Sequence, residues 1–207
     1  MKKFFTVIPL QTPSTLLYQA VDNPALQLDQ EVCFPIMTAI GGCTKPGEEI
    51  RVIAVLTDSE VCRKNLELFS ADLRALCEKK QLSCPNGVET VYVSGDDSVA
   101  TQVTTFRELM GRVDDNDELF ACMTYGTKPT STVVMMALQY AYRIKSNASI
   151  SGIVYGQVNR PNPKDESTWQ AKVYDMTALV KLDEVVHLLA ATKAPNPTEI
   201  IDMFLFG

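Results

Sequence analysis

The clearest fold signal in the chain runs from Leu119 to Leu138 and reads Leu-Phe-Ala-Cys-Met-Thr-Tyr-Gly-Thr-Lys-Pro-Thr-Ser-Thr-Val-Val-Met-Met-Ala-Leu. Its first residues are an apolar run of the kind that forms a strand buried on both faces. A polar turn containing Gly126 follows, and Pro129 suits the first turn of a helix because its missing N–H would have no partner there. The apolar residues from 133 to 142 predict that this helix is well buried. Strand, tight turn and helix in this order make half of a βαβ unit.

The turn between this strand and this helix is a candidate anion site. Unpaired N–H groups and the positive end of the dipole lie at the start of a helix, and Lys128 stands beside them. A phosphate group is the expected anion. The pattern is weak by itself, because turns of this kind in many α/β proteins hold no ligand. Neither the P-loop motif GxxxxGK nor the dinucleotide motif GxGxxG is present in the sequence.

The composition is that of an ordinary globular protein, with 207 residues, 46% hydrophobic and 21% charged. This length suits one α/β domain with a full core, with or without a short appendage. The net charge of -6 argues against a nonspecific surface for duplex nucleic acid, which would need a basic face. It leaves room for a small anionic ligand in one local pocket.

The cysteines and apolar runs bear on metal sites and on the compartment. Six cysteines without a CxxC pair and a single histidine argue against zinc, so we expect no metal and no cofactor. Free thiols are typical of a reducing cytoplasm, which is the expected location. No stretch approaches the ~20 apolar residues of a membrane span, so no membrane partner is expected. The apolar run after Met1-Lys2-Lys3 is interpreted as a strand rather than a signal peptide, because it contains Pro9 and lacks a cleavage site.

Hydrophobic patterning predicts an α/β chain in which strands and helices alternate. Strands are expected at residues 4–10, 50–56, 89–93, 119–123, 150–154 and 172–174. A short helix capped by Thr12 or Ser14 is expected after the polar turn at 11–15. Further helices are expected at 34–40 (with a strand as the alternative), 65–82, 99–110, 129–142 and 178–191. This order predicts a doubly wound, mostly parallel Rossmann-like sheet with helices on both faces.

Polar turns follow five of the predicted strands, at residues 11–15, 57–59, 94–97, 124–128 and 155–157. In doubly wound sheets, ligands bind at the carboxyl ends of the strands. Five turns rich in hydroxyl groups and glycine at one edge therefore predict a crevice for a nucleotide or a phosphate.

Three stretches resemble the CRISPR-associated Rossmann-fold (CARF) domains of type III CRISPR ancillary proteins. Ala-Cys-Met-Thr-Tyr-Gly-Thr-Lys-Pro at 121–129 resembles their T-x-G-x-K/R-P turn. Ile-Val-Tyr-Gly-Gln at 153–157 resembles their I-x-Y-G-A strand end. Lys-Val-Tyr-Asp-Met-Thr-Ala-Leu at 172–179 looks like the I-x-D-L-T-x-F/L segment that follows a variable hairpin. The order and spacing agree, and the resemblance covers roughly residues 1–190.

The resemblance implies a sensor for cyclic oligoadenylate, the second messenger of type III CRISPR antiviral defence. CARF domains bind this ring across a two-fold homodimer interface, so that the symmetry of the ligand matches that of the protein. The expected ring is cyclic tetra-adenylate. The expected partners are therefore this second messenger and a second copy of the chain.

The candidate ligand-binding residues come from the polar turns. Lys128, the one strong cation expected at this edge, and the helix N–H groups would bind phosphates, while threonine and serine hydroxyl groups would bind ribose or base edges. Tyr125 would either stack on a base or pack against the sheet, with packing the favoured alternative. The full candidate set is Gln11, Thr12, Ser14, Thr57, Ser94, Thr124, Tyr125, Gly126, Thr127, Lys128, Tyr155 and Gly156.

Receptor and enzyme remain alternatives, with the receptor favoured and no catalytic residue assigned. A ring nuclease would need no metal, because the ribose 2′-hydroxyl attacks the adjacent phosphorus and the protein supplies positioning and charge. Lys128 would then stabilise the phosphorane, and Ser14 or Thr12 would orient the nucleophile. His187 is expected deep in the last helix, away from the strand ends. A nucleotide-binding oxidoreductase is disfavoured by the missing glycine motif.

The predicted domain organisation places a CARF-like sensing domain at residues 1–192. Residues 193–207 follow the Ala-Pro-Asn-Pro boundary at 194–197 and are expected to be a C-terminal tail or the start of a truncated effector linker. The chain would then either act alone or be part of a longer effector.

Overall fold

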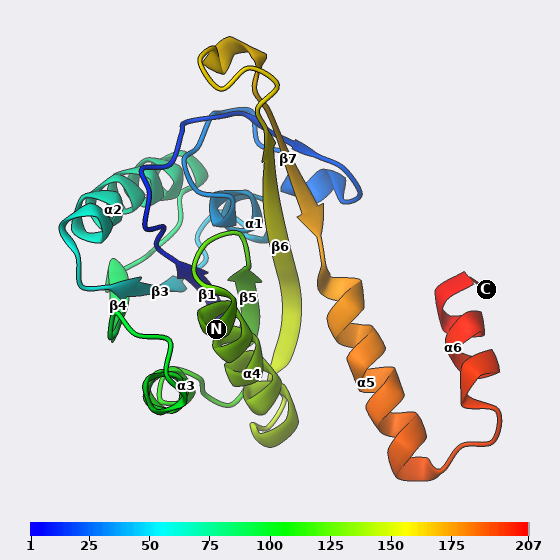
Figure 1. The fold of residues 1–207 in the computed structure, drawn as a ribbon. Coiled ribbons are helices and arrows are strands. Elements are labelled where there is room, and N and C mark those ends of the chain that lie inside the picture. Colours follow the sequence, from blue (N-terminus) through cyan, green and yellow to red (C-terminus); the bar gives the residue numbers. More distant parts are fainter. Residues whose placement is uncertain (207) are drawn as a thin grey trace. The chain divides into compact units, whose positions relative to one another are not determined.

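The centre of the fold is a mixed sheet, seen in a computed structural model that describes residues 1–206. Within these residues, seven strands pair in the order β2-β7-β6-β5-β1-β3-β4 (Figure 1). All neighbouring strands are parallel except β6 and β7, which are antiparallel. The strands are β1 (Lys2–Val7), β2 (Tyr18–Ala20), β3 (Ile50–Thr57), β4 (Val88–Val93), β5 (Glu118–Cys122), β6 (Ser149–Asn159) and β7 (Gln170–Asp175).

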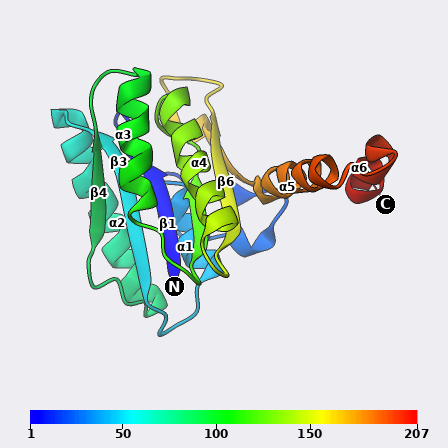
Figure 2. The same ribbon diagram turned by 90° about the horizontal axis from the view of Figure 1, so that it is seen from below.

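Helices cover both faces of this sheet. Figure 2 shows α3 and α4 in front of the sheet and α1 and α2 behind it. The chain therefore has the predicted α/β, doubly wound, mostly parallel Rossmann-like fold. The helices are α1 (Ile36–Cys43), α2 (Glu60–Lys80), α3 (Val99–Met110), α4 (Lys128–Ile144), α5 (Thr177–Thr192) and α6 (Pro197–Phe206), with short 3-10 turns at Pro24–Leu26 and Glu166–Thr168.

The central strands are buried on both faces, which explains their continuous apolar runs. Phe4 of β1 and Phe120 of β5 stack with ring centroids 4.6 Å apart, within the core that α1 and α2 cover. Phe5 and Ala121 are the next residues along these two strands and are also fully buried. The helix expected at 34–40 is confirmed as α1, and it continues through two glycines to Cys43.

The predicted short helix after the first strand is wrong. Residues 8–17 run without helix, and Leu16 instead forms an isolated antiparallel bridge with Val32. Pro13 disfavours a helical conformation of the residue before it. The buried side chain of Asn65 in α2 donates to the carbonyl groups of Pro9 and Gln11 at 2.9 and 3.0 Å. These bonds hold the segment along the edge of the sheet, so Thr12 and Ser14 cap no helix.

The predicted end of the strand at residues 155–157 is also wrong. β6 continues to Asn159 and forms a hairpin with β7, in which Tyr155 lies opposite Tyr174 and Gly156 opposite Val173. The ladder to β7 satisfies the backbone groups of these residues, so the strand has no reason to stop at the glycine. The polar segment 160–169 forms the tip of this hairpin.

The chain separates into two compact units, Met1–Asp175 and Met176–Gly207. The first unit contains the whole sheet and α1 to α4. In the second unit α5 packs against α6. Residues 197–206, which were expected to be part of a tail, are helical. Within residues 1–206, no helix combines the length and the hydropathy needed to cross a membrane.

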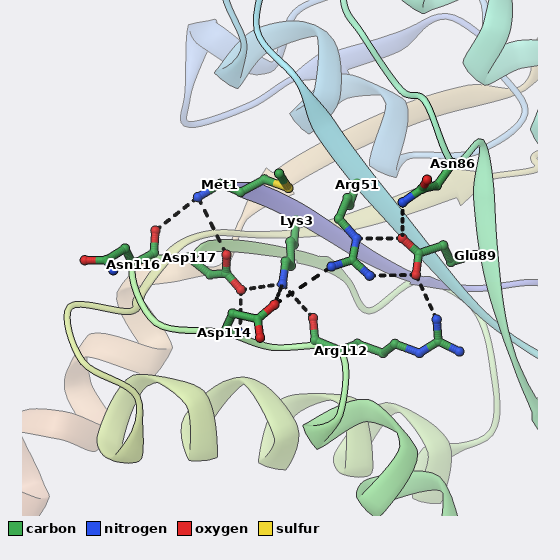
Figure 3. Close-up of polar contacts among 9 residues, drawn as sticks. All are labelled: Met1, Lys3, Arg51, Asn86, Glu89, Arg112, Asp114, Asn116 and Asp117. Carbon is green, nitrogen blue, oxygen red and sulfur yellow. Dashed lines mark hydrogen bonds and ion pairs between the residues drawn. The ribbon is translucent and has the colours of Figure 1, made fainter.

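A buried ionic network lies beneath the amino ends of the strands, opposite to the predicted binding edge (Figure 3). The ammonium group of Lys3, only 1% exposed, lies 2.7 Å from Asp114 and 2.6 Å from Asp117, and it donates to the carbonyl group of Arg112 at 2.9 Å. Asp117 is itself only 3% exposed. A buried lysine is tolerated here because two carboxylates and a carbonyl replace its water.

The neighbouring part of the network predicts how stability depends on pH. Glu89 accepts two hydrogen bonds from Arg51, at 2.6 and 2.7 Å, and one from Arg112, which lowers the pKa of Glu89 to about 2 from an ordinary 4.5. Because the folded pKa is depressed, this stabilisation is complete above pH ~4.5 and is lost as pH falls toward 2. We expect the free energy of unfolding to fall by up to about 3 kcal/mol over this window. Urea unfolding at pH 6 and at pH 3 measures most of this loss, about 2 kcal/mol. Glu89→Gln should show a smaller decrease, and an equal decrease in this variant would contradict the assignment.

Candidate functional site

A pocket of about 290 Å³ lies at the carboxyl ends of β1 and β5. Its walls are the loop that follows β1, the turn that follows β5 and the outer part of the β6–β7 hairpin. The carboxyl ends of β1, β3, β4, β5 and β6 share this edge of the sheet, because these strands are parallel. The pocket gathers six of the twelve predicted site residues, which are Gln11, Thr12, Ser14, Thr124, Tyr125 and Gly126.

The loop after β1 forms one wall and is positioned from below by Asn65. Gln11 and Thr12 are exposed, and Ser14 is half-buried. The side chain of Asn65 is only 1% exposed and binds two carbonyl groups at the start of the loop. The sequence analysis missed this residue. The sequence signal that indicates its burial is its position in α2, four residues before the buried Phe69 and therefore on the same apolar face.

The turn after β5 forms the opposite wall and is hydrogen bonded to β6. The hydroxyl group of Thr124 accepts a hydrogen bond from the backbone N–H of Gly156 in β6 at 2.7 Å. Gly126 has φ +100, which L side chains rarely adopt, and a Cβ atom there would lie 2.8 Å from Cγ1 of Val7. The turn therefore requires glycine at this position, and its close approach to β1 brings the two walls together.

The buried Tyr18 and the half-buried Tyr125 line the pocket. Tyr125 donates from its hydroxyl group to the carbonyl of Cys33 at 3.1 Å, and its ring lies at 79° to that of Phe34. Burial raises the pKa of Tyr125 well above 10 and raises the pKa of Tyr18 to about 12. Arg160 and the hydroxyl group of Tyr125 partly oppose this rise at Tyr18. Both tyrosines are therefore neutral, and Tyr125 packs in the manner favoured from the sequence.

The start of α4 differs from the expected anion site. Thr127 caps the helix, accepting from the N–H of Thr130, and its hydroxyl group donates to the carboxylate of Asp97 at 2.8 Å. A carboxylate therefore already lies at the positive end of the helix dipole. Lys128 is exposed and does not line the pocket, and the structure of residues 1–206 gives its ammonium group no ion pair.

The other predicted site residues lie outside the pocket. Thr57 ends β3, and Ser94 after β4 donates to Asp96 at 2.5 Å and lines a separate hollow of about 260 Å³ against α3. Tyr155 is 38% exposed and its ring lies 6.5 Å from that of Tyr174. Gly156 is required for packing, since a Cβ atom there would lie 2.3 Å from Pro35.

Arg160 at the end of β6 lines the pocket and was missed in the sequence analysis, which expected Lys128 as the one strong cation at this edge. That expectation is wrong. The central guanidinium carbon of Arg160 lies 4.7 Å from the ring centroid of Trp169, on the other side of the hairpin tip. The ring nitrogen of Trp169 donates to the carbonyl of Asn162 at 2.9 Å. A prediction that β6 and β7 pair as a hairpin would have placed Arg160 and Trp169 close together.

The chemistry of the pocket suits binding. Its lining within residues 1–206 contains hydroxyl, amide and guanidinium groups, while histidine, aspartate and glutamate do not contribute to it. Burial raises the pKa of the nearby Cys33 and Cys122 thiols, which keeps them protonated and poor nucleophiles. Among the residues that the structure describes, no group of three His, Cys, Asp or Glu side chains could hold a metal ion.

The fold and the pocket together define a Rossmann-like α/β protein with a polar pocket, lined by one arginine, at the carboxyl edge of its sheet. Comparison with models of known protein families gave no match, and no curated protein matches the sequence.

Proposed function

We propose that this protein binds cyclic oligoadenylate, with cyclic tetra-adenylate as the expected ring, across a homodimer interface, and acts as a sensor in type III CRISPR antiviral defence. The observation that carries the proposal is the pocket itself. It combines the loop after β1 with the turn at 124–126, which belongs to the first of the three CARF-like stretches.

The placement of all three CARF-like stretches supports the same function. The stretch at 121–129 is joined to the stretch at 153–157 by the hydrogen bond from Gly156 to Thr124. The stretch at 153–157 pairs with that at 172–179 through Gly156 opposite Val173 and Gln157 opposite Lys172. Parts of all three stretches, which are far apart in sequence, thus lie side by side, and this supports a shared role.

The shape and polarity of the pocket fit part of a nucleotide ring. A volume of about 290 Å³ lies at the lower end of the range of small-molecule pockets, which is roughly 300–1,000 Å³. A ring of several nucleotides would therefore extend beyond one pocket, which favours two copies sharing one ring. Hydroxyl and amide groups suit ribose and adenine edges, and an arginine suits a phosphate.

Binding and cleavage are tested with the same ligand, cyclic tetra-adenylate. We expect cyclic tetra-adenylate to bind with a stoichiometry of one ring per two chains in calorimetry, and sedimentation at micromolar protein to show a dimer. We expect the ring to remain intact for hours, because the described lining of the pocket lacks a general acid or base and equal binding of ground and transition states gives no acceleration.

The outcome separates receptor from ring nuclease. Linear products ending in a 2′,3′-cyclic phosphate, formed in the presence of EDTA, would move the metal-independent nuclease to first place. Failure of cyclic tri-, tetra- and hexa-adenylate to bind at 100 µM (a concentration of about 10⁻⁴ M corresponds to only ~5.5 kcal/mol of binding) would reject the sensor proposal.

A further inference from the structure

Arg160 lines the pocket, and within residues 1–206 its guanidinium group has no carboxylate partner. The ion pairs of residues 1–206 do not include it, although it lies on the pocket wall. Arg51, Arg63 and Arg112 differ, since each of them binds a carboxylate. The hydrogen-bond donors of Arg160 are therefore available to a ligand.

Trp169 restricts where this group can point. The guanidinium carbon lies 4.7 Å from the indole centroid, which is within the range of a cation–π contact. The indole is itself fixed by its hydrogen bond to Asn162, and the side chain of Asp165 accepts from the backbone N–H of Ser167 in the same hairpin tip. A planar guanidinium held on an aromatic ring loses less freedom when it binds an anion in a bidentate manner.

Lys128 is a weaker candidate for the same task. Arg160 and Lys128 are both exposed, but Lys128 lies outside the pocket and follows a helix cap that is hydrogen bonded to the carboxylate of Asp97. An approaching phosphate would be repelled by that carboxylate. At Arg160 the pocket wall contributes no acidic side chain.

We propose that Arg160, positioned by Trp169 on the β6–β7 hairpin, is the residue that binds a phosphate group of the nucleotide ligand in this pocket. The identity of the ligand as cyclic oligoadenylate rests on the proposed function. The recognition of a nucleotide phosphate by Arg160 rests on the geometry of the hairpin and the pocket alone.

The first test is calorimetric titration of the full chain with cyclic tetra-adenylate. Arg160→Ala should bind about 10- to 100-fold more weakly, as expected for the loss of a charge-assisted bond. Arg160→Lys should recover part of the affinity, and Trp169→Leu should bind about 2- to 5-fold more weakly with Arg160 still present. Lys164→Ala is the matched control, because it removes an exposed cation from the same hairpin outside the pocket, and its affinity should not change.

The second test uses the single tryptophan of the chain as a reporter. Ligand binding to Arg160 should change the fluorescence of Trp169, both with cyclic tetra-adenylate and with adenosine monophosphate or pyrophosphate at higher concentration. The change should be absent in Arg160→Ala. Circular dichroism should show that this variant is folded, because Arg160 is exposed.

The outcomes distinguish this inference from the proposed function. If the ring binds equally to the wild type and Arg160→Ala, or if Lys128→Ala costs more affinity, the inference is overturned and the sensor proposal remains. If the ring does not bind but pyrophosphate or adenosine monophosphate does so in an Arg160-dependent manner, the sensor proposal fails and the phosphate site remains. If none of the three probes binds, both are overturned.

Discussion

Replacement of Lys3 by methionine should lower the free energy of unfolding by about 3–5 kcal/mol. Methionine has a similar length but removes the closer of two positive charges beside the buried carboxylate of Asp117, leaving the terminal ammonium group of Met1 at 3.6 Å (Figure 3). The backbone carbonyl of Arg112 and the carboxylate of Asp114 would also lose a donor. Breaking one side of a buried ion pair is costly because it leaves the other charge buried without compensation. Urea unfolding followed by circular dichroism at pH 7 measures the change.

The matched control is Lys64→Met in α2. Lys64 pairs with Glu60 at 2.7 Å, but their side chains are 70% and 80% exposed, so water screens the pair. The control should change the free energy of unfolding by less than about 1 kcal/mol. A loss below 1 kcal/mol in Lys3→Met as well would mean that Asp117 finds other compensation.

Replacement of Asn65 by leucine should cost about 2–4 kcal/mol of stability and should also weaken ligand binding. Leucine is similar in size but leaves the carbonyl groups of Pro9 and Gln11 without their donor, and each unpaired buried acceptor costs about 1–3 kcal/mol. The loop after β1 would then lose its position, and with it one wall of the pocket. Urea unfolding and calorimetry with cyclic tetra-adenylate measure the two effects.

Glu67→Leu provides the comparison on the same helix. Glu67 is two residues away on the exposed side of α2, so its replacement should change neither stability nor affinity by more than about 0.5 kcal/mol. If Asn65→Leu lowered stability while leaving affinity unchanged, the loop after β1 would have no part in binding. That result would move the site toward the turn after β5 and the hairpin.

Most of the fold could be predicted from the sequence, because its signals are local. Buried runs such as 50–56 and 119–123 have the composition of double-sided strands, and the stripe at 65–82 has the period of a helix. The exception after β1 arose because its conformation depends on Asn65, which is more than fifty residues away. The end of β6 was placed too early because its last residues are stabilised by β7, a strand that comes later in the chain.

The sequence by itself determined the α/β class, the edge of the sheet at which the pocket lies, and six residues that line this pocket, because strand order and polar turns are properties of short segments. The tertiary structure decided which cation faces the pocket. Lys128 is adjacent to the glycine turn in sequence, yet at the start of α4 it is exposed and does not line the pocket. Arg160 enters the site only because an antiparallel hairpin places it on Trp169, and such pairing depends on contacts between residues that are not neighbours in the chain.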